Sequence, residues 1–396
     1  MKKTFCLLFT VALLLTMAVP AGAEQPSNTA ALIMDFETGQ ILYAENIDAP
    51  LPPASITKLM TMHLVFEAIA EGKIQLDDQV KASANASSLP DGSSTIFLGT
   101  GEVLTVDELL EAVAIISAND AGIALAEYIA GSESAFVAMM NEKANELGLT
   151  NTTFINAHGL HTEGHVMSAR DIAILTRATL EKYPEILDYS SKKFLRMERE
   201  TRYVRQGYFD MHSTYASLIG WRNIDGLKTG WTPEARRCIT VPAAEGSRRY
   251  IVVVMGEETI PLRDKRVKEL LAQAFDQFQP SVPVKAGEVI DSISIELAKE
   301  KEAEIVPVKD VTLVMSRTDK LEDFEERIEI LPNLKAPMGK GDVVGTLSYY
   351  KNGELVTAVD LVLNENAEKA SFLTRILRYL SQIFVDLGNW IVGLFA

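Results

Sequence analysis

The chain has 396 residues, of which 47% are hydrophobic and 23% are charged, and its formal net charge is −16 at pH 7. This composition is typical of a globular protein, and the length allows two domains, so the chain as a whole is not expected to be disordered. The negative charge offers no net attraction to a nucleic acid, which argues against nucleic-acid binding.

Residues 1–23 have the form of a cleaved export signal. Lys2 and Lys3 precede an apolar run over residues 5–19, which ends at Ala21-Gly22-Ala23, a small-x-small site for signal peptidase. A retained transmembrane anchor is the less favoured alternative, because the apolar run is short and a small-residue site ends it. The mature chain is therefore expected to begin at residue 24.

The two cysteines are not expected to form a disulfide. Cys6 lies in the predicted signal, which leaves Cys238 as the only cysteine of the mature chain. Cys238 lies in the strand-like run 237–241, where a buried structural thiol is favoured over a reactive one.

Residues 24–280 predict a mixed α+β domain. Two apolar runs within 30–43 predict a β-hairpin, and residues 55–70 are apolar on nearly all sides, which predicts a buried helix. Further helices are predicted at 109–116, 120–129, 134–147, 168–183 and 263–278, and residues 249–255 predict a central strand. Capping boxes are predicted at Thr105-Glu108 and Ser168-Asp171. The expected architecture is an antiparallel sheet with helices packed on its faces.

The composition changes after Pro280, and residues 281–366 predict a small all-β, sandwich-like domain. Its alternating segments predict strands at 293–297, 311–315 and 327–331, and a hairpin of 343–349 with 355–362.

Residues 367–396 predict an amphipathic helix. Its apolar residues recur at the helical period, and Arg375, Arg378 and Gln382 fall mostly on the opposite side. This pattern is typical of a helix that lies in a membrane interface, so the segment is interpreted as a membrane anchor. A helix docked on its own domain is the alternative.

Three short motifs carry the candidate chemistry. Ser55 and Lys58 are three residues apart at the start of a predicted helix, so the amine lies on the same face as the hydroxyl and can take its proton. An isolated Ser-x-x-Lys is a common accident on a surface helix. Ser117-Ala118-Asn119 and Lys228-Thr229-Gly230 follow in the order found in class A β-lactamases and penicillin-binding proteins, which makes the combination specific.

With these motifs, the chain closely resembles the low-molecular-mass penicillin-binding proteins of the D-alanyl-D-alanine carboxypeptidase family. The resemblance also covers Gly92-Ser93-Ser94, Asn156-Ala-His-Gly-Leu160, Ser168-Ala-Arg-Asp171 and Asp225-Gly-Leu-Lys-Thr-Gly230, and it extends over essentially the whole chain. It implies a β-lactamase/transpeptidase-like fold in residues 24–280. It also implies an exported enzyme at the outer face of the cytoplasmic membrane, with peptidoglycan stem peptides as substrates, β-lactam antibiotics as inhibitors, and no cofactor or metal.

The resemblance also implies roles for the motif residues. Ser55 would attack the carbonyl between two D-alanines, with Lys58 as the base and Ser117 as a proton relay to the leaving amine. Asn119 would hold the substrate amide or orient Lys58. The backbone N–H groups of Ser55 and Trp231 would bind the oxyanion.

A carboxypeptidase also binds a terminal carboxylate, which calls for cations and hydroxyls. Lys228 and Thr229 qualify, and the resemblance implies this role for Arg263. Gly230 is expected among the other substrate-binding residues. Lys228 would in addition lower the pKa of Lys58 through its positive charge. The alternative for Arg263 is a solvated charge at the start of a helix.

The chain departs from the family pattern after Lys-Thr-Gly, where Trp231 stands in place of a histidine and Arg236 in place of a glycine. Both are expected to narrow or recharge the cleft. His161 replaces an aspartate of the family. With His158 and His165 it is spaced as metal ligands are on a helix, but neighbouring glycines indicate a loop, and a structural role is favoured for His158.

Two other functions stay open at this stage. A β-lactamase shares the three motifs but needs neither a β-domain nor an anchor. A catalytically silent peptidoglycan-binding scaffold is allowed by Trp231 and Arg236, although the intact motifs argue against it.

Overall fold

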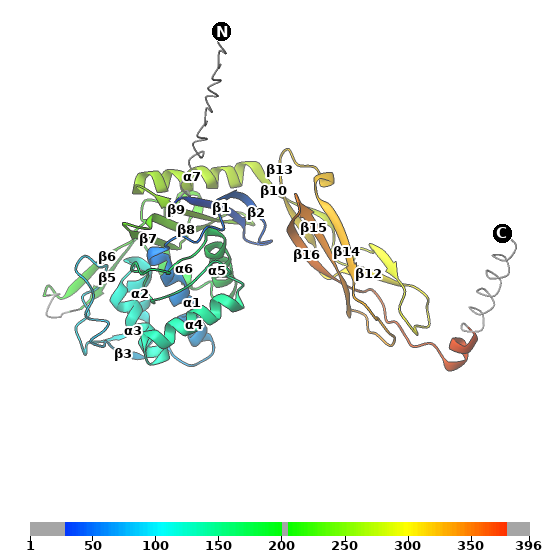
Figure 1. Cartoon of the computed structure of the whole chain (residues 1–396), viewed down its shortest axis with the longest axis horizontal. Coiled ribbons are helices and arrows are strands. Elements are labelled where there is room, and N and C mark those ends of the chain that lie inside the picture. The colour runs from blue at the N-terminus through cyan, green and yellow to red at the C-terminus, as the bar shows by residue number, and fades with distance from the viewer. Residues whose placement is uncertain (1–27, 200–204, 378–396) are drawn as a thin grey trace, which may run out of the picture.

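The computed structural model describes residues 28–199 and 205–377. The predicted signal and most of the predicted C-terminal anchor lie outside the described residues. A five-stranded antiparallel sheet, in the order β2-β1-β9-β8-β7, forms the framework of the first domain (Figure 1). Its strands are β1 (Ala30–Asp35), β2 (Ile41–Glu45), β7 (Lys228–Thr232), β8 (Arg236–Glu245) and β9 (Arg248–Glu257). The predicted N-terminal hairpin is confirmed, and the predicted central strand is β9.

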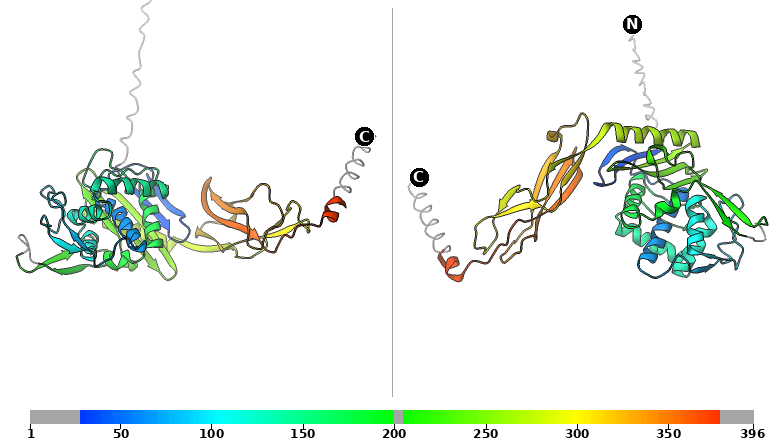
Figure 2. Two further views of the ribbon diagram at one scale, coloured as in Figure 1. Left: turned by 90° about the horizontal axis from the view of Figure 1, so that it is seen from below. Right: turned by 180° about the vertical axis from the view of Figure 1, so that it is seen from behind.

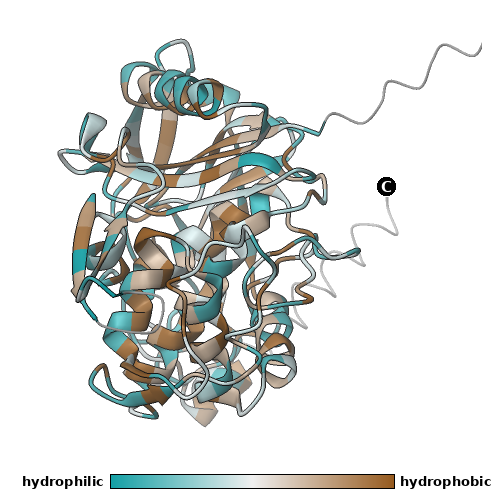
Figure 3. Ribbon diagram, turned by 90° about the vertical axis from the view of Figure 1, so that its left-hand side faces the viewer, coloured by the Kyte–Doolittle hydropathy of each residue, from teal (hydrophilic) through white to brown (hydrophobic). Residues whose placement is uncertain are grey.

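Both faces of this sheet are covered because residues alternate along its strands. Leu32 and Val253 face a core built on α1 (Lys58–Ala70) and α5 (Ala169–Lys182). Ile33 and Val252 face the opposite side, where α7 (Ile260–Gln277) packs. Apolar residues, brown in Figure 3, are frequent in the strands and in the helices beside them.

The predicted helices form, with small shifts at their ends. They are α2 (Val106–Ile115), α3 (Asn119–Ala130), α4 (Glu133–Glu146) and α5, and a short helix α6 (Ile186–Ser190) was not predicted. α7 begins one turn before the predicted start, because Thr259 caps it and Pro261 is compatible with a first helical turn.

One of the two predicted capping boxes is only half formed. At α2, Thr105 and Glu108 cap each other reciprocally, as predicted. At α5, the Ser168 hydroxyl accepts the Asp171 N–H, but the Asp171 carboxylate accepts bonds from the Asn151 N–H and the Thr152 hydroxyl instead. Asp171 therefore ties a neighbouring loop to the helix.

Two small antiparallel hairpins were not predicted from the sequence. β3 (Gln79–Lys81) pairs with β4 (Val103–Thr105), and β5 (Phe194–Glu198) pairs with β6 (Tyr208–His212). The second hairpin matters for the site, because Arg199 at its end binds the loop that precedes β4.

The C-terminal domain is all-β, as predicted. Its larger sheet has the order β11-β12-β16-β15-β14, and β10 pairs with β13. The strands are β10 (Phe278–Val284), β11 (Asp291–Ile293), β12 (Ala303–Pro307), β13 (Val311–Ser316), β14 (Glu325–Ile330), β15 (Val343–Lys351) and β16 (Glu354–Leu363). The strand predicted at 293–297 is wrong beyond Ile293, β12 was missed, and Pro280 lies inside β10.

This β-rich part lies beyond the end of α7, as the two views of Figure 2 show. The Gln40 side-chain amide donates to the Val314 carbonyl and accepts the Val314 N–H, each at 2.8 Å, which joins the turn between β1 and β2 to β13. Residues 372–377 form a short helix after the last strand. Within residues 28–199 and 205–377, no single helix is long and apolar enough to cross a bilayer, although the bent pair α3 and α4 passes by length and composition.

Candidate active site

Ser55 lies in a 3-10 turn, Ala54–Thr57, that leads directly into α1. The turn begins with a positive φ of 47° at Ala54, a left-handed conformation that is unusual for a residue with a Cβ atom. Lys58 is the first residue of α1 and is fully buried, whereas Ser55 is half-buried. The Lys58 Nζ atom lies 3.0 Å from the Ser55 Oγ atom, so the predicted pair is confirmed as a contact.

Lys58 has two further acceptors. Its Nζ atom lies 2.5 Å from the Oδ1 atom of Asn119, the first residue of α3, and 2.6 Å from the carbonyl oxygen of His158. Burial holds the pKa of Lys58 well below its usual value, and the cation of Lys228 lowers this pKa further against an opposing effect of Asp120. The structure thus favours a neutral amine beside Ser55.

Ser117 lies between α2 and α3 with φ of 64°. Its Oγ atom is buried and has no hydrogen-bond partner among the described residues. Ser94 stabilises this turn, because its hydroxyl donates to the Ile116 carbonyl at 2.6 Å and its carbonyl accepts the Asn119 N–H at 2.7 Å. The Ser117 hydroxyl is therefore free to bond a substrate.

β7 brings Lys228, Thr229, Gly230 and Trp231 to the edge of the sheet, next to Ser55. Lys228 is fully buried, and burial lowers its pKa to about 7. The hydroxyls of Thr229 and Thr214 lie 2.6 Å apart.

A cleft of about 400 Å³ joins these elements. It is lined by Ser55, Gly92, Ser93, Ser94, Ile116, Ser117, Asn119, Gly159, Leu160, Thr214, Thr229, Gly230, Trp231, Thr232, Pro233, Arg237, Ile260 and Arg263. All predicted site residues except the two buried lysines line it. Trp231 lines the cleft and is 52% exposed.

The arginines of the cleft differ from the sequence-based expectation. Arg263 is only 2% exposed and donates from Nε and Nη2 to Asp264 Oδ1, so its interpretation as a solvated charge is wrong. Arg236 does not line the cleft and lies 3.9 Å from Glu258. Arg237, which sequence reasoning missed, lines it instead.

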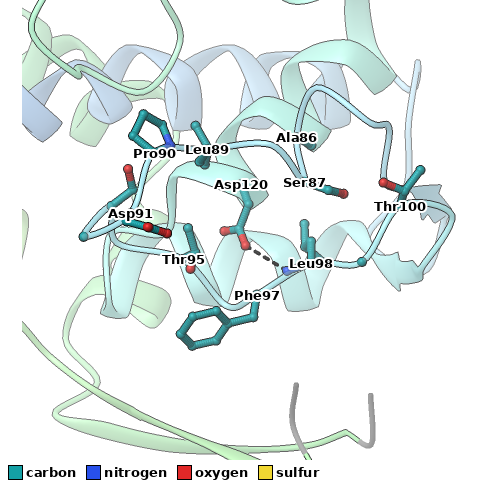
Figure 4. Close-up of a pocket in the computed structure, with 13 residues that line it drawn as sticks. Ala86, Ser87, Leu89, Pro90, Asp91, Thr95, Phe97, Leu98, Thr100 and Asp120 are labelled. Carbon is teal, nitrogen blue, oxygen red and sulfur yellow. Dashed lines mark hydrogen bonds between the residues drawn. The ribbon is translucent and has the colours of Figure 1, made fainter. Parts of the chain in front are cut away.

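A second cavity of about 630 Å³ adjoins the cleft at Gly92 and Ser93 (Figure 4). Asp120 lies at its base, where its carboxylate accepts the N–H groups of Ile96 and Leu98. From the other side, Arg199 donates to the carbonyls of Ile96 and Phe97 and forms an ion pair with Glu102. Asp120 and Arg199 together fasten the loop that carries Gly92, Ser93 and Ser94.

The three clustered histidines do not form one group. His165 bonds the Thr57 hydroxyl and accepts the Ile155 N–H, while the His158 ring accepts the Leu160 N–H. Burial lowers the pKa of His158 to about 3 and that of His165 to about 4, so both rings are neutral near pH 7. His161 is exposed and outside the cleft. Among the residues that the structure describes, no three His, Cys, Asp or Glu side chains are placed to hold a metal.

Cys238 is buried in β8, as predicted, and its thiol donates to the Ala235 carbonyl. Burial raises the pKa of this thiol to about 11. It is therefore unreactive as a nucleophile at neutral pH.

Comparison with known proteins agrees with this geometry. A family model for D-alanyl-D-alanine carboxypeptidases matches residues 17–259, and a model for the C-terminal domain of penicillin-binding protein 5 matches residues 278–369. The D-alanyl-D-alanine carboxypeptidase DacF of Bacillus subtilis is 35% identical, with 98% of this chain and 99% of that protein covered.

Two solved structures extend the comparison. Penicillin-binding protein 5 of Haemophilus influenzae is 31% identical with a TM-score of 0.72, over 86% of this chain and 97% of that one. Penicillin-binding protein D2 of Listeria monocytogenes, solved with ampicillin bound, is 31% identical with a TM-score of 0.54, over 62% of this chain and 96% of that one. The chain belongs to the D-alanyl-D-alanine carboxypeptidase family and is a D-Ala-D-Ala carboxypeptidase of the penicillin-binding type.

Proposed function

We propose that this carboxypeptidase removes the terminal D-alanine of peptidoglycan stem peptides through an acyl-enzyme on Ser55. The observation that carries the proposal is the contact between the Ser55 hydroxyl and a buried Lys58 whose pKa is strongly lowered. A serine hydroxyl is a weak nucleophile until an adjacent base takes its proton.

The hydrogen-bond partners of Lys58 orient its amine toward Ser55. A neutral amine has two N–H bonds and one lone pair. Asn119 Oδ1 and the His158 carbonyl, at 2.5 and 2.6 Å, accept the two N–H bonds. The lone pair is then directed at the Ser55 hydroxyl, 3.0 Å away. Asn119 is in this view an orienting residue for Lys58, and it also lines the cleft, where its amide can bond the substrate.

Acylation follows from this arrangement. The Ser55 oxygen attacks the carbonyl between the two D-alanines as its proton moves to Lys58. The backbone N–H groups of Ser55 and Trp231 stabilise the negative oxygen of the tetrahedral intermediate. When the C–N bond breaks, the proton on Lys58 passes through the Ser117 hydroxyl to the leaving amine, and free D-alanine departs.

Deacylation returns the enzyme to its starting state. Water attacks the ester carbonyl, its proton moves to Lys58, and the Ser55 oxygen leaves with that proton. The shortened peptide is released with a new carboxylate.

Recognition of the substrate's terminal carboxylate is assigned to the end of the cleft near α7. Thr229 and Arg263, the fourth residue of α7, line the cleft, and the buried amine of Lys228 comes from the residue before Thr229 in β7. Gly230 keeps the backbone of β7 close to Ser55. A terminal carboxylate is stabilised by such charged donors.

β-Lactam antibiotics are proposed to acylate the same serine. Support comes from the ampicillin-bound relative from Listeria monocytogenes and from the open cleft beside Trp231. The open cleft and the intact contacts of Lys58 argue against a silent scaffold.

The chain is also proposed to be exported after loss of residues 1–23, with residues 24–280 as the peptidase domain, 281–366 as the β-domain and 367–396 as a peripheral membrane anchor. Phe372 and Leu373, within the described part of this segment, are 71% and 66% exposed. Truncation before Phe372 should release active enzyme from membranes. A truncated enzyme that still sediments with membranes would contradict the anchor.

The first test is intact-mass spectrometry of the enzyme mixed with benzylpenicillin, with Ser55→Ala as the control. The expected result is a one-to-one adduct on the wild type alone, together with Ser55-dependent release of D-alanine from a peptide. An adduct that persists in Ser55→Ala would place the nucleophile elsewhere, and rapid antibiotic hydrolysis without an adduct would indicate a β-lactamase.

A further inference from the structure

Arg237 is in an unusual position for a charged residue. It is the cross-strand partner of Trp231 in the β7–β8 pair, so the two side chains share one face of the sheet. The Arg237 guanidinium lies 4.6 Å from the centre of the Trp231 ring. Trp231 thus provides a flat apolar support on which the guanidinium stacks, a favourable cation–π arrangement.

Within residues 28–199 and 205–377, no acidic side chain lies within ion-pair distance of Arg237. Only two of the cleft-lining residues are charged, Arg237 and Arg263, among those the structure describes. Arg263 has its own carboxylate, because Asp264 accepts both of its bonds and is held by the Ser217 hydroxyl. Arg237 forms no ion pair with the described residues, and its buried Nε atom has no hydrogen-bond partner among them.

Arg263 also affects Arg237 through its charge. Burial lowers the pKa of Arg237, and the nearby cation of Arg263 lowers it further. Two cations with only one carboxylate between them, in a partly desolvated cleft, are stabilised by an anion that enters it. Arg237, next to Trp231, is the cation without a carboxylate partner among the described residues.

We propose that Arg237 is a specificity-determining residue that binds the terminal carboxylate of the substrate, with Trp231 holding its guanidinium in place. The proposal rests on the function proposed above and adds to it a residue particular to this cleft. Asp264 orients Arg263, and Arg237 adds a second positive charge, without a carboxylate partner, that favours a carboxylate over a neutral end.

The alternative is that Arg237 only supports Trp231. A pair of substrates separates the two. Diacetyl-lysyl-D-Ala-D-Ala has one carboxylate, at its C-terminus, so an effect on it cannot come from another acidic group of a stem peptide. The same tripeptide as a C-terminal amide keeps the scissile bond and lacks the charge.

The experiment compares kcat/KM for the acid and the amide in full-length wild type, Arg237→Gln, Arg237→Lys and Arg236→Gln. Arg236→Gln is the matched control, because it removes the same charge from the neighbouring residue, which does not line the cleft. In Arg237→Gln, kcat/KM for the acid should fall roughly ten- to hundredfold, mainly through KM, with the amide changed by less than about twofold. Arg237→Lys should keep most of the preference for the acid, and Arg236→Gln all of it.

If Arg237→Gln lowers kcat/KM equally for the acid and the amide, Arg237 only supports Trp231. A preference for the acid that is unchanged in Arg237→Gln would also overturn the inference. Acylation by benzylpenicillin and by its uncharged methyl ester gives an independent readout, with the same selective loss expected for the charged form. Failure of the proposed function looks different: the wild type itself would neither release D-alanine nor form a Ser55 adduct.

Discussion

Gly230 lies against the backbone of Ser55, so the edge strand β7 and the turn that carries Ser55 are in direct contact. A Cβ atom on Gly230 would lie 2.5 Å from the Pro53 carbonyl oxygen and 3.1 Å from the Ser55 nitrogen. The proposed oxyanion site uses the N–H groups of Ser55 and Trp231, and its width is therefore set by the missing side chain between them.

Gly230→Ala is expected to displace β7 from the nucleophile, because backbone atoms at 2.5 Å cannot yield as a flexible side chain does. Displacement of reacting groups by about 1 Å costs on the order of a hundredfold in rate. The acylation rate with benzylpenicillin should fall by about that factor, with a loss of stability of about 1–3 kcal/mol. Gly339→Ala is the control, since the nearest atom to its new Cβ is an Asp342 oxygen at 3.7 Å. Equal acylation rates in the two variants would contradict the role assigned to Gly230.

The pH profile of acylation should depend on Lys228. The reaction needs Lys58 as a neutral amine, so the rate rises with pH through the pKa of Lys58. The positive charge of Lys228 lowers that pKa. In Lys228→Gln the pKa of Lys58 rises, and the rising limb of the profile should shift to higher pH, mainly below about pH 7, where Lys228 keeps its proton. The measurement is the rate constant for acylation between pH 5 and pH 10 in both proteins; a lower rate with an unshifted limb would show that Lys228 acts only in binding.

Local patterns in the sequence predicted much of the fold and the contact between Ser55 and Lys58. The hairpin around Gly39, the buried helix after Ser55 and the reciprocal cap of Thr105 and Glu108 all depend on residues within a few positions of one another. The Ser55–Lys58 contact is of the same kind, because residues three apart share one face of a helical turn.

Contacts between distant segments were not predictable in this way. Arg237 enters the cleft because the β7–β8 register pairs it with Trp231, and a shift of one residue would bring Arg236 there instead. Asp171 fits a capping box by its spacing, but its carboxylate accepts bonds from the Asn151 N–H and the Thr152 hydroxyl instead. Both the strand register and the choice of partner for a carboxylate depend on contacts between segments that are distant in the sequence, so local patterns do not predict them.

Asp120 is expected to act as a positioning residue for the loop shown in Figure 4. Its carboxylate accepts the N–H groups of Ile96 and Leu98, and the loop carries Ser94, which bonds the turn of Ser117. In Asp120→Asn one acceptor oxygen becomes a donor facing these N–H groups, which costs about 1–3 kcal/mol. Hydrogen exchange at Ile96 and Leu98 should accelerate.

The matched control for this change is Asp91→Asn, an exposed carboxylate on the same loop. It should leave exchange at Ile96 and Leu98 unchanged. If Asp120→Asn also leaves both amides as protected as in the wild type, the loop is fastened by Arg199 alone.

Acid should destabilise the fold through His63. Its ring is fully buried in α1 and bonds the Thr179 hydroxyl, and burial lowers its pKa to about 4. The unfolded chain, with the usual histidine pKa near 6.5, binds the proton more readily, so this contribution to stability is present above about pH 6.5 and is lost as pH falls toward 4. At pH 5 the loss is on the order of 2 kcal/mol.

Urea unfolding at pH 7 and pH 5 measures this effect. His63→Gln removes the titrating ring, so the fall in unfolding free energy between the two pH values should shrink by about 2 kcal/mol, even if the variant is less stable at pH 7. His212→Gln, at an exposed position, should show the same fall as the wild type. Because the prediction concerns a difference between two pH values, the packing cost of the substitution cancels, and an unchanged fall in His63→Gln would mean that the acid sensitivity lies in His158 and His165.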